Sequence, residues 1–150
     1  MVEPTIIANF GEGDTGKSDS IKRVYEKLTN VKEDRKDICE VVMINKIKVG
    51  IASDGDDIKI VERNLDGFVD KGCQIILTAC RSNHNSVVLL NKYKNEYKYR
   101  IWRTSNARIY EYIDKDNPRI APKGIQTRFN ENWATEIANL IEAWCYAGKE

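Results

Sequence analysis

The hydrophobic positions of this chain follow two patterns, which are short apolar runs and apolar residues at helical spacing. The first run, Pro4–Phe10, is rich in β-branched residues and predicts a buried strand. The next segment, Ser18–Val31, predicts a helix, because its apolar residues recur three or four positions apart at Ile21, Val24, Tyr25, Leu28 and Val31. The chain is therefore expected to open with a strand followed by a helix.

The same two patterns continue through the middle of the chain. Ile38–Ile44 and Lys46–Ala52 predict two strands joined by a tight turn, which would pair as an antiparallel hairpin at one side of a sheet. Asp57–Lys71 has helical spacing, and Gly72 follows it as the expected C-cap. The most apolar run is Cys73–Cys80, which predicts a strand in the centre of the sheet.

The last third of the chain is more polar. Asn85–Tyr97 predicts a helix, and the alternation of Tyr97–Trp102 is typical of a half-exposed strand. Residues 112–127 contain prolines, a glycine and many charges, which indicates a loop. Asn130–Ala147 places large apolar side chains on one helical face, so we expect a final helix that packs on the sheet.

Strands that alternate with helices predict a three-layer α/β/α fold with a mostly parallel sheet and an antiparallel hairpin at its edge. At 150 residues, the chain is expected to form a single domain over 1–150. Ligands of such sheets bind at the carboxyl ends of the strands. Three segments are therefore candidates for a site, namely Ser53–Asp57, Thr78–Asn83 and Arg103–Asn106.

Between the first strand and the first helix, residues 11–18 read GEGDTGKS and match G-x-x-x-x-G-K-[ST]. Glycines let a backbone curl so that successive N–H groups point at one anion. Lys17 is expected to reach the outer phosphates, and the Ser18 hydroxyl to ligate Mg²⁺. The residues expected to contact a nucleotide are Gly11, Glu12, Gly13, Asp14, Thr15, Gly16, Lys17, Ser18 and Asp19.

This motif, with a strand before it and a helix after it, resembles the Walker A phosphate-binding loop of the P-loop NTPases. The chain is similar to small, uncharacterised ATP-binding P-loop proteins of bacteria and phages. The resemblance implies that it binds ATP or another nucleoside triphosphate together with Mg²⁺. Glu12 and Asp14 depart from the pattern, because carboxylates within the loop weaken its positive potential. The alternative is a glycine-rich structural turn without a ligand.

P-loop NTPases carry an acidic residue at the end of a neighbouring strand, which holds the Mg²⁺ directly or through water. Asp54 and Asp56 are the candidates, as metal partners or as a catalytic base, because carboxylate oxygens suit a hard cation. The alternative is a turn into a helix, in which Asp56 or Asp57 acts as the N-cap. The other strand that could lie beside the first strand is Cys73–Cys80, and it ends without an acidic residue.

Arg81 follows that strand and is a candidate for stabilising the charge that develops during phosphoryl transfer. Its alternatives are an ion pair with Asp54 or a surface position. Ser82, Asn83, His84 and Asn85 form a polar cluster at a predicted helix start. Capping explains most of this cluster, although His84 is also a candidate general base.

Composition excludes several classes of function. The chain carries 24 basic and 23 acidic residues, so its charge gives no reason to expect a nucleic-acid or membrane partner. The segment Lys92–Tyr110 interleaves aromatic and basic residues, as nucleic-acid-binding surfaces do, but strand periodicity also explains that order. The four cysteines lack zinc-ligand spacing and predict mainly buried free thiols. With neither a signal peptide nor a membrane span predicted, we expect a cytoplasmic protein.

Two functions remain open at the level of sequence. The first is an enzyme, a Mg²⁺-dependent NTPase or a kinase-like phosphotransferase with an unknown acceptor. Arginines of residues 103–128 would form a lid over the phosphates in a kinase (Arg103, Arg108, Arg119 and Arg128). The second is a regulatory module that binds a nucleotide, turns over little and signals to a partner protein. An incidental anion site ranks behind both, and no Asn-Lys-x-Asp guanine signature is present.

Overall fold

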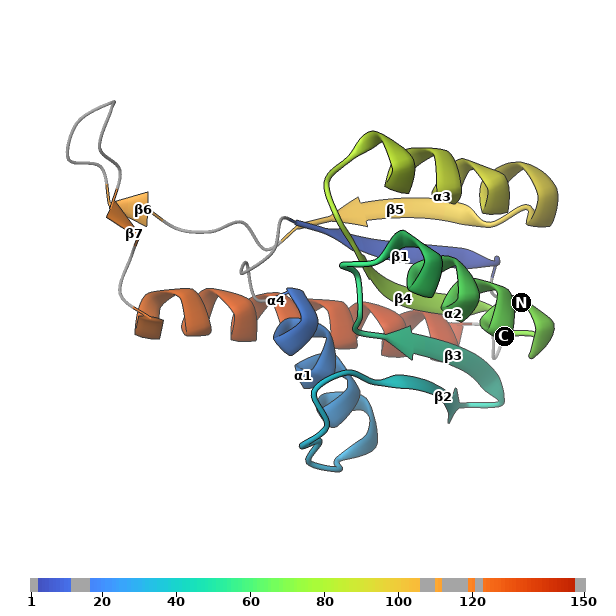
Figure 1. The fold of residues 1–150 in the computed structure, drawn as a ribbon. Helices are drawn as coiled ribbons and strands as arrows, with labels where there is room; N and C mark the ends of the chain where they lie inside the picture. Colours follow the sequence, from blue (N-terminus) through green and yellow to red (C-terminus); the bar gives the residue numbers. More distant parts are fainter. Residues whose placement is uncertain (1–2, 12–16, 106–109, 112–118, 121–122, 148–150) are drawn as a thin grey trace.

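The computed structural model describes residues 3–11, 17–105, 110–111, 119–120 and 123–147. Figure 1 shows the arrangement of the elements. The main sheet contains β1 (Thr5–Phe10), β2 (Cys39–Ile44), β3 (Ile47–Ala52), β4 (Ile75–Cys80) and β5 (Arg100–Thr104). The helices are α1 (Lys17–Thr29), α2 (Ile58–Asp70), α3 (His84–Tyr97) and α4 (Lys123–Ala147). A separate pair of short strands is formed by β6 (Tyr110–Glu111) and β7 (Arg119–Ile120).

The five strands of the main sheet lie in the order β2-β3-β4-β1-β5. All neighbours are parallel except β2 and β3, which form the predicted antiparallel hairpin at one edge. The central strand is β4, and every one of its residues is buried, as its apolar run predicted. The sequence did not indicate that β4 separates β3 from β1, and this order determines which loops meet at the site.

Helices cover both faces of the sheet, as expected for an α/β fold (Figure 1). On one face, α1 and α4 pack on the sheet through residues such as Ile21, Val24 and Ile141. On the other face, α2 and α3 contribute Leu65, Phe68 and other buried side chains. The general fold prediction, a mostly parallel sheet between two layers of helices, is therefore confirmed.

Several predicted boundaries are wrong in the second half of the chain. The strand expected over Tyr97–Trp102 is β5 and begins at Arg100, because α3 continues to Tyr97. Lys98 then adopts the left-handed conformation (φ 62°), and its N–H donates to the Tyr93 carbonyl. This C-cap turns the chain before the strand can start.

The loop expected over 112–127 and the helix expected from Asn130 are corrected where the structure describes them, and residues 112–118 and 121–122 lie outside the described part of the chain. β7 lies within that range, and α4 already begins at Lys123. Ile125 and Phe129 are 49% and 43% exposed, so the first turns of α4 have no buried apolar stripe that would have indicated a helix.

The four cysteines are free thiols, with Cys39 exposed and the other three buried. Among the residues that the structure describes, no helix combines the length and the apolar character needed to cross a membrane.

Candidate functional site

The site lies at the edge of the sheet where the parallel strands end. β1, β3, β4 and β5 run in one direction, so their carboxyl ends share this edge. Gly11 donates its backbone N–H to the carbonyl of Cys80 over 3.0 Å, which fixes the start of the motif beside the end of β4. The chain resumes as α1 at Lys17, so the motif stands between a strand and a helix, as expected. The other predicted loop residues lie outside the described part of the chain (Glu12, Gly13, Asp14, Thr15 and Gly16).

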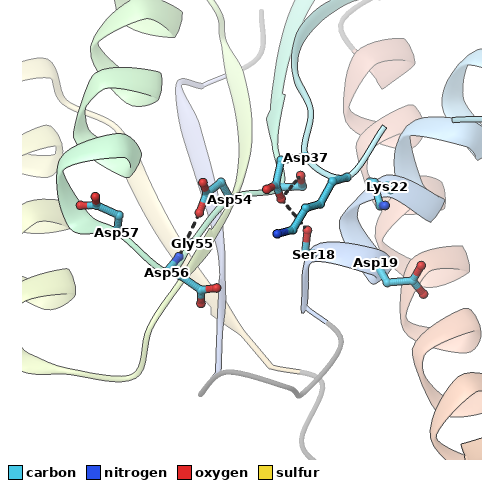
Figure 2. Close-up of a pocket in the computed structure, with 10 residues that line it drawn as sticks. Ser18, Asp19, Lys22, Asp37, Asp54, Gly55, Asp56 and Asp57 are labelled. Atoms are coloured by element: carbon cyan, nitrogen blue, oxygen red, sulfur yellow. Dashed lines mark hydrogen bonds between the residues drawn. The ribbon is translucent and has the colours of Figure 1, made fainter. Parts of the chain in front are cut away.

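A cavity of about 490 Å³ opens at this edge (Figure 2). Its walls come from the start of α1, the segment before β2, and the loop between β3 and α2. The lining residues are Ser18, Asp19, Lys22, Lys36, Asp37, Ser53, Asp54, Gly55, Asp56 and Asp57. The cavity thus brings together Ser18, Asp54 and Asp56, which the sequence proposed as a metal site, although β4 separates β3 from β1.

The sequence predictions did not include three residues of this cavity, Lys22, Lys36 and Asp37, of which Asp37 contacts Ser18. The Ser18 hydroxyl donates a hydrogen bond to Asp37 Oδ1 over 3.0 Å, and the Ser53 hydroxyl donates to the same oxygen over 3.2 Å. Figure 2 shows Ser18 and Asp37 pointing toward each other across the cavity. A signal was present in the sequence: an antiparallel hairpin places the start of β2 opposite the end of β3, and hence at the carboxyl edge of the sheet.

Ser53 anchors the segment that carries Asp37. Its side chain is fully buried, and its hydroxyl oxygen accepts the backbone N–H of Ile38 over 2.8 Å. Its own N–H donates to the Ile38 carbonyl over 2.9 Å. Three hydrogen bonds from one buried residue therefore hold Asp37 beside Ser18, so the position of this carboxylate is built into the fold.

The loop between β3 and α2 approaches β4 closely at Gly55. A Cβ atom there would lie 2.6 Å from the carbonyl carbon of Ala79, which leaves room for glycine only. Asp54 stabilises the turn by accepting the backbone N–H of Asp56 over 3.2 Å. The N-cap of α2 is Asp57, whose carboxylate accepts the Lys59 N–H over 2.9 Å. Of the two predicted capping candidates, Asp57 therefore has this role.

Arg81 lies on the far side of that loop. Its Nε is 3.6 Å from Asp56 Oδ1, so the ion pair is made with Asp56 and not with Asp54. Both side chains are largely exposed, and such a contact contributes little to stability. Asn83 is the N-cap of α3 and accepts the Ser86 N–H over 2.9 Å. Capping thus accounts for Asn83, and His84 is the first residue of the helix.

The cavity is lined by five carboxylates and two ammonium groups. Two of the carboxylates are turned outward in Figure 2: Asp57 caps α2, and Asp19 forms an ion pair with Arg23 at 2.9 Å. Of the other three, Asp37 accepts the hydrogen bond from Ser18, while Asp54 accepts the Asp56 N–H and Asp56 faces Arg81. Within the described ranges, no three acidic, cysteine or histidine side chains are grouped as a metal site. Mg²⁺ commonly uses only one or two protein carboxylates, with water and phosphate oxygens as further ligands.

The described part of the aromatic and basic segment, residues 92–105, divides between core and surface. Tyr93 and Tyr99 are buried, and burial, with a hydrogen bond to Asp66, raises the pKa of Tyr93. These two rings are therefore core residues and are not available to stack on bases. Arg103, one of the expected lid arginines, packs over the Phe10 ring at 4.2 Å from its centroid. Arg108 lies outside the described residues.

Comparison with protein-family models, with curated proteins and with solved structures finds no match to this chain. The assignment of a function therefore depends on the motif and on the geometry of this cavity.

Proposed function

We propose that this chain is a P-loop protein that binds ATP or another nucleoside triphosphate with Mg²⁺, and that it hydrolyses or transfers the terminal phosphoryl group. The observation that carries the proposal is the meeting of Ser18 with Asp37 and Asp54 in one cavity, directly after a GxxxxGKS sequence. A structural turn has no need of a lysine, a serine and two carboxylates at this place.

The donor set fits Mg²⁺. Ser18, Asp37 and Asp54 all present oxygen atoms, which are the ligands that this hard cation prefers. Because the Ser18 hydroxyl donates its hydrogen bond to Asp37, the lone pairs of its oxygen are left to face a cation. When bound, the ion would neutralise charge on the phosphates. Ser18 and Asp54 would hold it, and Asp37 would orient Ser18.

The remaining residues have distinct proposed roles. Lys17 would contact the outer phosphates, and the backbone of residues 11–16 would enclose them. Asp56 would act as a further metal partner or as a base, in agreement with its place on the cavity wall. Arg81 pairs with Asp56, and it would stabilise the charge that develops during phosphoryl transfer. The buried free thiols also support a reducing compartment such as the cytoplasm.

The alternative, a nucleotide-binding module with little turnover, uses the same site. It differs only in the fate of the triphosphate, so one experiment separates the two functions. Purified protein is incubated with MgATP, while nucleotide binding is measured by calorimetry and phosphate release by a colorimetric assay.

The decisive variant is Lys17→Ala, and its matched control is Lys32→Ala, which removes an exposed lysine outside the cavity. We expect Lys17→Ala to lose binding and phosphate release together, while Lys32→Ala keeps both. Binding without release in the wild-type chain would identify the module. Equal nucleotide binding by the wild type and Lys17→Ala, or no binding by either, would contradict the proposed function.

A further inference from the structure

Two smaller hollows continue from the cavity toward the other face of the sheet. The first, of about 110 Å³, shares Gly55 and Asp56 with the wall of the main cavity. The second, of about 300 Å³, shares Ile58 and Asn85 with the first. The three hollows therefore follow the loop between β3 and α2 from the candidate phosphate site to the groove between α2 and α3, which lie on the same face (Figure 1).

The hollow nearest the phosphate site is polar and carries a cation. Arg81 is half exposed, and its guanidinium forms no hydrogen bond to any residue that the structure describes, only the 3.6 Å ion pair with Asp56. The start of α3 lines the same hollow, and the positive end of the helix dipole adds to the field of Arg81. A planar anion can accept two parallel hydrogen bonds from such a guanidinium.

The outer hollow is mainly apolar. Its wall includes Ile58, Leu89 and Val88, and Val88 is 54% exposed despite its apolar side chain. The stems of Lys59 and Lys92 extend this surface, and the Lys92 ammonium lies 3.4 Å from Glu62 Oε2. A volume of about 300 Å³ suits a compact body the size of one ring, at the lower limit of small-molecule sites.

We propose that this groove binds the phosphoryl acceptor, and that the acceptor is a small carboxylic acid with a compact apolar body. The carboxylate would pair with Arg81 beside Asp56, and the apolar body would cover Ile58 and Val88. The inference rests on the proposed function, because a phosphoryl donor must occupy the adjoining cavity.

A carboxylate suits this position chemically. One of its oxygens forms a bond to the γ-phosphorus, while the bond between that phosphorus and the β,γ-bridging oxygen breaks. The electron pair of the broken bond leaves with the nucleoside diphosphate, and the product is an acyl phosphate. No proton moves in this step, so no general base is needed. An alcohol would need one, and it would offer Arg81 no second anionic group besides Asp56.

The inference is tested by titrating ¹⁵N-labelled protein with phenylacetate and following the amide shifts by NMR. Phenylacetate combines a ring with a carboxylate, whereas acetate lacks the ring and phenylacetamide lacks the charge. We expect saturable shifts at Ile58, Arg81 and Val88, and binding at least about tenfold weaker for both partial compounds. Equal shifts with all three compounds, or shifts outside the groove, would overturn the proposal.

Variants locate the binding to the groove. Arg81→Gln and Val88→Asp should each weaken phenylacetate about tenfold, whereas Arg63→Gln, at an exposed arginine on α2, should not. Both changed side chains are largely exposed, so folding is preserved and is verified from the same spectra. If Arg81→Gln binds phenylacetate as tightly as the wild type does, the assignment of Arg81 as the partner of the carboxylate is overturned.

The test also separates this inference from the proposed function. Phenylacetate should bind in the presence of MgADP as well as in its absence, because the two sites adjoin without overlapping. Displacement of phenylacetate by adenosine or ADP would show that the groove holds the base of the nucleotide, and the acceptor site would be rejected. Phenylacetate binding without any nucleotide binding would instead reject the proposed function and leave the groove as a carboxylate site.

Discussion

Gly55 controls the position of the acidic loop that follows β3. A Cβ atom added there would lie 2.6 Å from the backbone of Ala79, so the loop would have to move away from β4. We expect Gly55→Ala to lower the free energy of unfolding by about 1–3 kcal/mol and to weaken nucleotide binding. Urea unfolding and calorimetry with MgATP measure the two effects.

Gly67 provides the matched control, because it lies inside α2 and a Cβ there has nothing within 4 Å. Gly67→Ala should raise the free energy of unfolding by about 0.5–1 kcal/mol, since alanine loses less conformational entropy in a helix. Nucleotide affinity should not change. A Gly55→Ala protein as stable as the wild type would show that this loop adapts, and that its contact with Ala79 does not position the carboxylates.

Asp37 is predicted to affect the metal dependence of nucleotide binding. Asp37→Asn keeps the shape of the side chain but removes the negative charge of the group that accepts the hydrogen bond from Ser18. Partners that orient a metal ligand typically change metal affinity by about 10–100-fold when they are replaced. We therefore expect the Mg²⁺ concentration for half-maximal ATP binding to rise at least about tenfold.

Asp34→Asn serves as its control, because it removes a nearby exposed carboxylate that does not line the cavity. It should leave the Mg²⁺ requirement unchanged. If both variants shift this requirement equally, the effect is one of general charge, and the hydrogen bond from Ser18 to Asp37 has no specific role.

The candidate site was only partly predictable from single residues. Ser18 carries recognisable chemistry at the start of a helix, and Asp54 and Asp56 do so after a strand, and the structure brings all three into one cavity. Asp37 was missed, and Ser53 was placed in a candidate segment without its role, because both roles come from hydrogen bonds between segments more than a dozen residues apart. Such bonds depend on the register of the hairpin, which composition and periodicity do not specify.

Between elements, one acidic residue joins the helix that follows the motif to the last helix. Glu131 on α4 accepts hydrogen bonds from Lys27 and, over 2.6 Å, from Arg23 on α1. All three side chains are 32–39% exposed, so solvent screening limits their contribution. Glu131→Gln should lower the free energy of unfolding by about 0.5–1 kcal/mol at neutral pH.

This contribution should depend on pH in one direction. The hydrogen bond from Lys27, followed by that from Arg23, lowers the pKa of Glu131 in the folded chain. The stabilisation is therefore complete above the ordinary carboxyl pKa of about 4.3. It is lost as the pH falls through the lowered folded-state value. Urea unfolding of wild type and Glu131→Gln should differ at pH 7 and converge in acid.

Glu136→Gln, at an exposed glutamate on the same helix, is the control and should differ little from wild type at either pH. High salt, about 1 M, should also reduce the Glu131 effect, because it shortens the screening length to about 3 Å. A difference that persists unchanged in acid would contradict the ion-pair explanation and indicate a packing defect.

Element boundaries were predictable where a buried face or a cap marks them. α1 and α2 combine an apolar stripe with polar ends, and their predicted limits lie within two residues of the structure. β5 and α4 were misjudged because their ends depend on tertiary context. The left-handed cap at Lys98 delays the strand, and the exposed first turns of α4 carry no apolar stripe that faces the core.

Over the whole molecule, the alternation of strands and helices was sufficient to predict the layers of the fold. The apolar run of β4 was sufficient to predict that this strand lies in the centre of the sheet. The order of β1, β4 and β3 was not predictable. An apolar run indicates that a strand is buried, but it does not indicate which strands lie beside it. That order determines the site: the loop after β3 reaches past the end of β4 toward Ser18, and Gly55 permits the close approach.

A final prediction concerns the stability of the folded chain as a whole. The residues of the proposed site come from α1, the segment before β2 and the loop after β3, so the site exists only when the sheet has formed. MgATP should then bind the native state alone and stabilise it by mass action. At a hundredfold excess over Kd the gain is about 2.7 kcal/mol. For a chain of this length, that gain raises Tm by about 5–10 °C.

Calorimetric scans with ATP in excess EDTA should lose most of this shift, and Lys17→Ala should lose all of it while its Tm without ligand stays near that of the wild type. Asp37→Asn should recover the shift only at raised Mg²⁺ concentration, because its site is intact but less well oriented. A Tm shift of equal size in Lys17→Ala would mean that ATP acts elsewhere on the chain. The cavity between α1 and the β3–α2 loop would then not be the nucleotide site.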